Sequence, residues 1–191
     1  KLFSRLLDDG YDILHIAFSS ALSGSCSVAE ATAIEICEER PDAKIVVVDS
    51  LCASMGEGLL VHKAVELKEK GKSIDELKDW LENNKLNICH MFTVDDLHHL
   101  QRGGRVSKTS AIIGSFLNVK PVLHVNNEGR LIPLLNVRGR KKALTNLVDQ
   151  MEARIKDGKI NNDIVFISHG DCEDDARFVA DLIKERFGIQ K

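Results

Sequence analysis

The sequence predicts an α/β protein with two domains, in which a parallel-sheet α/β domain precedes an α+β domain. Apolar runs without polar alternation, at residues 12–18 and 44–49, are typical of parallel strands covered on both faces. A segment with helical spacing follows each run, which indicates a parallel sheet with crossover helices. After residue 86 the pattern changes to a hairpin followed by helix, strand and helix, so we place the domains at residues 1–86 and 87–191.

The composition excludes several classes of protein. The chain has 191 residues, 43% of them hydrophobic and 29% charged, with a net charge of -3 that gives no general attraction to nucleic acid or anionic membranes. No apolar run reaches the roughly 18 residues of a membrane span, so we expect at most transient membrane contact. The five cysteines are odd in number and form no CxxC pair, which favours reduced thiols, a cytoplasmic location and no metal site.

The first domain is expected to begin inside a helix. Phe3, Leu6 and Leu7 follow helical spacing up to Gly10, and the chain does not begin with methionine, so we expect a fragment. Ser73 and Glu76 form a capping box that opens a further helix. Helices are also predicted from the end of the serine-rich loop to about residue 40 and over residues 54–70.

The second domain is expected to begin with a strand over residues 87–94. A short apolar helix is predicted over residues 110–117, and two strands over 120–125 and 130–135 form a hairpin. The remaining elements are a long helix over 141–156, a strand over 163–168 and a closing helix over 174–187.

The loop at residues 19–24 is the first candidate site, because open α/β sheets bind ligands where a parallel strand leads into a helix. Ser19, Ser20 and Ser23 supply hydroxyl donors there, Gly24 permits close approach, and a helix N-terminus favours a carboxylate or phosphate. Simple N-capping by serine is the alternative. A nucleophilic serine is a weaker one, because the loop is not Gly-x-Ser-x-Gly and no His/Asp pair can be assigned to it.

Two basic segments form the second candidate site. The segment 101–108 places two glycines between arginines, of which Arg105 is one, and the segment 138–142 begins with Arg138 at the start of the long helix. Guanidinium groups hold carboxylates and phosphates well, although a solvated surface turn is the plain alternative. His98 and His99 are adjacent and cannot share a helical face as a metal pair, and Asp49-Ser50 at a strand end also fits a simple cap.

These segments together resemble the DegV family. The motifs that carry the resemblance are Phe18-Ser-Ser-Ala-Leu-Ser-Gly24, Val47-Val-Asp-Ser50, Leu100-Gln-Arg-Gly-Gly-Arg-Val-Ser-Lys108, Asn118-Val-Lys-Pro-Val122 and Gly129-Arg-Leu with Val137-Arg138. The resemblance implies two α/β domains with one fatty acid between them. Its first strand and its C-terminal segment have no counterpart in this chain.

The resemblance also implies a function. DegV proteins resemble carriers that present a fatty-acid carboxylate to a separate fatty-acid kinase, so we expect a lipid-binding protein without catalytic residues or cofactor. Ser23, with Ser20 and Gly24, matches the carboxylate-binding loop. Arg105 and Arg138 match positions that engage the phosphate-bearing partner or product.

Two other functions remain open. A phosphotransferase-like enzyme would need a P-loop or paired carboxylates for Mg²⁺, and the sequence has neither. A lipid-sensing regulator would act through partner proteins. Nucleic acid is the weakest candidate partner, because the chain is mildly acidic and only 5% aromatic.

Overall fold

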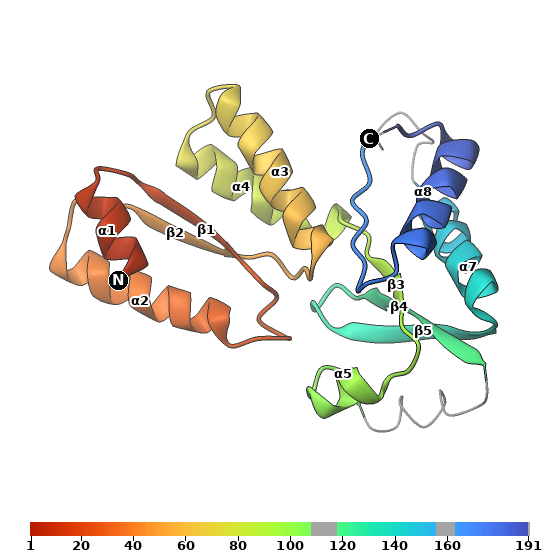
Figure 1. Cartoon of the computed structure of the whole chain (residues 1–191). Helices are drawn as coiled ribbons and strands as arrows, with labels where there is room; N and C mark the ends of the chain where they lie inside the picture. Colours follow the sequence, from red (N-terminus) through yellow and green to blue (C-terminus); the bar gives the residue numbers. More distant parts are fainter. Residues whose placement is uncertain (108–117, 156–162, 191) are drawn as a thin grey trace. The chain divides into compact units, whose positions relative to one another are not determined.

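A computed structural model describes residues 1–107, 118–155 and 163–190 of the chain (Figure 1). The chain divides into two compact units. The first comprises Lys1–Ile88 together with Asn127–Gly129, and the second comprises Cys89–Asn126 and Arg130–Lys191. The expected pair of domains divided at residue 86 stays a prediction.

The first unit alternates helices and strands. Its elements are α1 (Leu2–Asp8), β1 (Ile13–Ala17), α2 (Ser25–Glu39), β2 (Ile45–Asp49), α3 (Met55–Glu69), α4 (Ile74–Asn84) and the 3-10 helix η1 (Lys85–Asn87). β1 and β2 pair in parallel, with Ile13 opposite Ile45 and Ala17 opposite Asp49. The predicted parallel pairing is therefore confirmed, and both strands end at the same edge of the sheet.

The core of the first unit lies where α3 and α4 meet the strands. Its buried members are Val48, Cys52, Leu60, Ala64 and Leu81. The capping box at the start of α4 is confirmed, because the Ser73 side chain accepts the Glu76 N–H and the Glu76 carboxylate accepts the Ser73 N–H.

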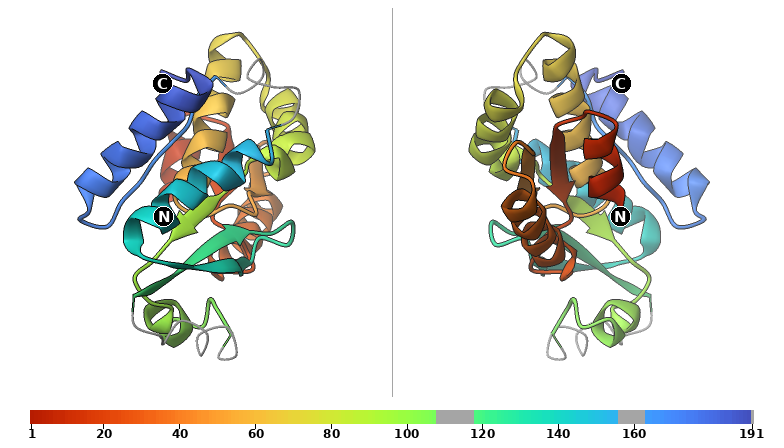
Figure 2. Two further views of the ribbon diagram at one scale, coloured as in Figure 1. Left: turned by 90° about the vertical axis from the view of Figure 1, so that its right-hand side faces the viewer. Right: turned by 90° about the vertical axis from the view of Figure 1, so that its left-hand side faces the viewer.

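The second unit is built on an antiparallel sheet in the order β3-β4-β5. Its elements are β3 (Met91–Thr93), α5 (His98–Arg102), β4 (Val119–Val125), β5 (Leu131–Arg138), α7 (Arg140–Glu152) and α8 (Glu173–Phe187). The predicted hairpin is confirmed, and its ladder carries a β-bulge at Val122/Leu123. Helix α7 packs against all three strands of this sheet (Figure 2).

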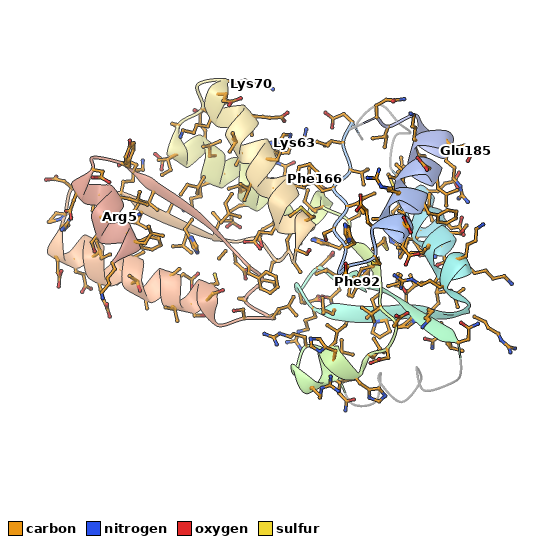
Figure 3. The ribbon with its side chains drawn as sticks, viewed as in Figure 1. Arg5, Lys63, Lys70, Phe92, Phe166 and Glu185 are labelled. Atoms are coloured by element: carbon orange, nitrogen blue, oxygen red, sulfur yellow. The ribbon has the colours of Figure 1, made fainter. Side chains whose placement is uncertain are left out.

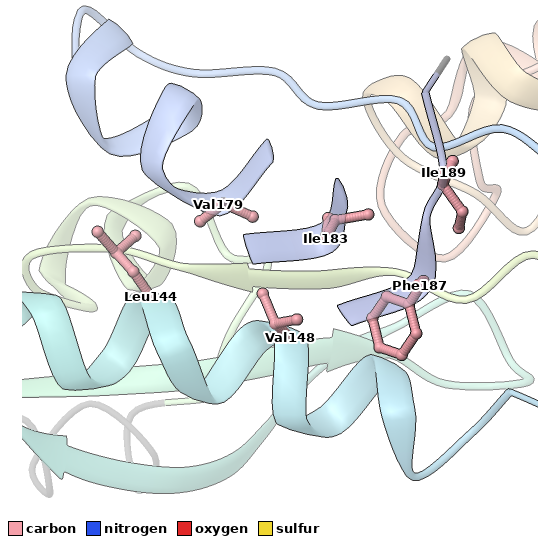
Figure 4. Packing of buried hydrophobic residues seen from close by; sticks show 6 residues of the cluster. All are labelled: Leu144, Val148, Val179, Ile183, Phe187 and Ile189. Atoms are coloured by element: carbon pink, nitrogen blue, oxygen red, sulfur yellow. The ribbon is translucent and has the colours of Figure 1, made fainter. Parts of the chain in front are cut away.

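Two clusters of apolar side chains stabilise the second unit. One joins α7 to α8 and the residues that follow (Figure 4), and its buried members are Leu144, Val148, Val179, Ile183, Phe187 and Ile189. The other is formed by Leu97, Val106 and Leu123, and Phe92 packs against it. Figure 3 labels the Phe92 side chain, which comes from β3.

One sequence prediction in this unit was wrong, and another was confirmed over a shorter range. The structure assigns no strand to residues 163–168, because an apolar run predicts burial and does not by itself specify the backbone conformation. Val165 instead packs against the α7–α8 cluster. The strand predicted over 87–94 is shorter, since Asn87 ends a 3-10 turn and β3 begins at Met91. The helix predicted over 110–117 lies outside the described residues.

Candidate functional site

The loop of residues 19–24 lies at the edge where β1 and β2 both end. The backbone N–H of Ser19 donates to the Cys52 carbonyl oxygen at 3.0 Å, and the Ser50 N–H donates to the Ala17 oxygen at 3.1 Å. These bonds join the loop after β1 to the loop after β2. The serine-rich segment therefore leaves the sheet at a defined position.

A tight turn then brings Ser23 to the start of α2. The Ser19 carbonyl oxygen accepts the N–H groups of Leu22 at 3.0 Å and Ser23 at 3.1 Å, while the Leu22 side chain is buried. Ser20 and Gly24 are exposed, and Ser23 is half-buried. All three predicted ligand-binding residues thus belong to one short turn, open to solvent on one side.

The Ser23 hydroxyl lies beside the first backbone N–H of α2. Its Oγ accepts the Ser25 N–H at 3.2 Å and lies 3.1 Å from the Ser25 Oγ, to which it donates. Gly24, rather than a serine, is the N-cap residue, and the first turn of α2 contains no acidic side chain. The positive end of this 15-residue helix is therefore not neutralised by its own carboxylates, which favours an anion there.

A buried serine ties this loop to the hairpin turn. The Ser19 hydroxyl is fully buried and donates to the Gly129 carbonyl oxygen at 2.9 Å. A Cβ atom added to Gly129 would lie 2.1 Å from Ser19 Oγ and 3.2 Å from Leu51 Cα. Sequence reasoning placed Ser19 among the donors and Gly129 in a turn, but no local signal could pair residues 110 positions apart.

Asp49 is a second residue whose role the sequence left open. One oxygen of its carboxylate, Oδ1, accepts the N–H of Ser20 at 3.1 Å and the N–H of Leu51 at 3.0 Å. The Lys85 ammonium group donates to the Asp49 main-chain oxygen at 3.0 Å. The simple cap considered for Asp49 is therefore only part of its role, since it also holds the serine loop.

The ionisable groups behind the loop are shifted toward their neutral forms. Burial raises the pKa of the Cys52 thiol to about 12 and that of the Cys26 thiol to about 11. Burial also raises the pKa of the Glu57 carboxyl, in the first turn of α3. Thiols with such high pKa values are poor nucleophiles at neutral pH, so covalent catalysis by these cysteines is disfavoured.

The two predicted basic residues lie on the second unit. Arg105 is exposed just after α5, and its Nη1 donates to the Gly103 carbonyl oxygen at 3.0 Å. Arg138 is exposed at the end of β5, opposite Val119. The serines belong to the first unit and these arginines to the second.

The next basic residue, Arg140, is already paired. Its Nε lies 2.8 Å from Asp175 Oδ2, and its Nη1 lies 3.9 Å from Asp95 Oδ1. The Lys120 ammonium group adds a 2.7 Å contact to the same oxygen of Asp95. Arg140 therefore braces the start of α7 against α8, and the exposed Arg138 is better suited to an external anion.

Histidine side chains were the remaining candidate metal ligands in the sequence. His98 and His99 open the short helix α5, and His169 Nδ1 accepts the Cys172 N–H at 3.2 Å in a turn before α8. Over residues 1–107, 118–155 and 163–190, no cluster of three His, Cys, Asp or Glu side chains could hold a metal ion. Within the same residues, no helix has the length and apolarity that crossing a membrane requires.

Comparisons with known proteins identify the family of this chain. The family model described as "Uncharacterised protein, DegV family COG1307" matches residues 1–191. A DegV domain-containing protein of Clostridium perfringens is 45% identical over 190 residues, which cover 100% of this chain and 65% of that relative. The chain thus spans just under two thirds of the length of this relative.

Solved structures share the fold. A fatty-acid-binding DegV family protein of Streptococcus agalactiae is 31% identical with a TM-score of 0.81, and the match covers 100% of this chain and 65% of that one. The Fatty Acid Kinase (Fak) B3 protein of Streptococcus pneumoniae, loaded with linoleic acid, is 25% identical with a TM-score of 0.81, over 93% of this chain and 62% of that one. With a family match over its whole length and a relative of this identity, the chain belongs to the DegV family.

Proposed function

We propose that the protein binds one long-chain fatty acid and holds its carboxylate at the loop Ser20–Gly24. The observation that carries the proposal is the Ser23 hydroxyl beside the first N–H of α2, at a helix end without acidic side chains. Hydroxyl and N–H donors at a helix N-terminus both favour a carboxylate. The proposal includes no cofactor and no metal.

The solved relatives support a fatty acid rather than another anion. The Streptococcus agalactiae protein is described as fatty-acid-binding, and the Streptococcus pneumoniae protein carries linoleic acid. Each buried CH₂ group contributes about 0.8 kcal/mol, so a sixteen-carbon tail offers roughly 10 kcal/mol before ordering costs. A few polar contacts at the head group then suffice for tight binding. The stretch 111–117, a candidate for lining the tail, lies outside the described residues.

We also propose that the protein presents the carboxylate to a partner fatty-acid kinase and transfers no phosphate itself. The exposed guanidinium groups of Arg105 and Arg138 are suited to a phosphate on the partner or on the product. The sequence has no P-loop of its own. The Streptococcus pneumoniae relative, named as a fatty acid kinase B protein, supports this arrangement.

Native mass spectrometry of the purified full-length protein, followed by solvent extraction, tests the proposal. We expect one long-chain fatty acid per protein. Ser23→Ala removes a hydrogen bond to a charged group. Such a bond contributes about 1.5–3 kcal/mol, so the affinity for the fatty acid should fall roughly 10- to 100-fold. Ser27→Ala, an exposed serine in the same first turn of α2, is the matched control and should retain the ligand.

Other outcomes discriminate among the alternatives. A protein that is empty and takes up no added fatty acid contradicts the proposal. ATP turnover by the protein alone would indicate an enzyme. A fatty-acid-dependent complex with a partner, without formation of acyl phosphate, would indicate a lipid-sensing regulator.

A further inference from the structure

One oxygen of the Asp49 side chain joins the two loops at the carboxyl edge of the β1–β2 sheet. Asp49 is the last residue of β2, and its Oδ1 accepts the Ser20 N–H from the loop after β1 and the Leu51 N–H from the loop after β2. The two donors are 31 positions apart in the sequence.

The loop after β2 would not hold its shape unaided. Leu51 has φ +53° and Ser54 has φ +50°, both in the left-handed region that side chains rarely adopt. Hydrogen bonds offset this strain, because the Leu51 N–H is held by Asp49 and the Cys52 N–H by the buried Ser50 hydroxyl at 3.0 Å. The Asp49 carboxylate therefore stabilises the strained loop after β2, and its hydrogen bond from the Ser20 N–H holds the serine loop against it.

Asp49 is badly suited to contact a fatty acid directly. A carboxylate repels another carboxylate, and Asp49 Oδ1 is already occupied by two backbone donors. Its main-chain oxygen is engaged by Lys85, whose side chain is mostly buried. The residue is placed to orient the binding loop from behind.

We infer that Asp49 is a positioning residue of the fatty-acid site, which holds the backbone of Ser20 so that the following turn presents Ser23 and the N-terminus of α2 to the carboxylate. The inference rests on the proposed function. A positioning role depends on where the acceptor oxygen of residue 49 lies, whereas a role in charge balance depends on whether the side chain is negative.

Two conservative variants separate position from charge. Asp49→Asn keeps an acceptor oxygen at the same place without the charge, whereas Asp49→Glu keeps the charge and moves the oxygens by one methylene. We expect the Asp49→Asn variant to bind oleic acid within about 3-fold of the wild type and the Asp49→Glu variant to bind it at least about 10-fold more weakly. The same two substitutions at Asp75, which forms an exposed ion pair with Lys44 in the same unit, are the controls and should leave affinity unchanged.

Hydrogen–deuterium exchange of the peptide containing residues 19–25, measured without ligand, is the second readout. We expect faster exchange in Asp49→Glu than in Asp49→Asn or in either Asp75 variant. The inference is overturned if Asp49→Glu binds oleic acid as well as or better than Asp49→Asn, or if exchange is the same in both variants. If the wild type binds no oleic acid, the proposed function fails, and the exchange comparison still supports or overturns the positioning role.

Discussion

Replacing Gly129 by alanine tests the contact between the serine loop and the hairpin turn. The added Cβ would lie 2.1 Å from the Ser19 Oγ, far inside van der Waals contact, and Gly129 has φ +73°. The Ser19 hydroxyl is fully buried and donates to the Gly129 carbonyl oxygen at 2.9 Å. The substitution must therefore displace the turn or the hydroxyl and break this bond.

The expected loss of stability has two parts. A side chain in the left-handed region costs about 1–2 kcal/mol, and a buried hydroxyl left without its partner costs about 1–3 kcal/mol. The free energy of unfolding should therefore fall by about 2–5 kcal/mol. At about 2–4 °C per kcal/mol for a chain of this size, Tm should fall by roughly 4–20 °C in a calorimetric scan.

Gly104→Ala is a matched backbone control. Gly104 has the same φ of +73°, but a Cβ atom there meets nothing within 4 Å, so only the conformational part should appear. Combining Ser19→Ala with Gly129→Ala should give less than the sum of the single losses, because the two residues share one contact. Equal decreases in Tm for Gly129→Ala and Gly104→Ala would refute the close approach.

Two further predictions concern the first unit. The Lys72 ammonium group and the capping bonds lower the pKa of Glu76 to about 2 from an ordinary 4.5, so its stabilisation is present above pH 4.5 and is lost as pH falls toward 2. Glu76→Gln should flatten the acid-unfolding curve in that window, followed by the fluorescence of Trp80; an unchanged curve would contradict the prediction. Because Leu60 is fully buried, Leu60→Ala should lower the free energy of unfolding by about 2–5 kcal/mol. Val65→Ala, at an exposed position, should lower the free energy of unfolding by less than about 0.5 kcal/mol. Urea titration of both variants measures these losses, and similar losses at the two positions would place Leu60 outside the core.

Local signals predicted most of the elements. The apolar runs that became β1 and β2, the capping box at Ser73 and the helical spacing in α7 are each encoded within a few residues. One apolar run was predicted wrongly as a strand. The run at residues 163–168 has a strand's composition, but a ladder depends on a neighbouring strand that the run itself does not specify.

The candidate site could also be predicted only in part. The position of the serine loop between a strand and a helix could be predicted, because it follows from the order of the elements. The roles of Ser20, Ser23, Gly24, Arg105 and Arg138 as binding residues stay predictions.

The alternation of strands and helices, the DegV motifs and the serine-rich turn that leads into a helix can all be predicted from the sequence, because they depend on neighbouring residues. The contacts that hold this turn in place are seen only in the folded chain. The Ser19 hydroxyl is bound by Gly129, 110 positions away, and the Ser20 N–H by Asp49, 29 positions away. Such bonds form only after folding has brought distant segments together, so no local pattern could reveal them.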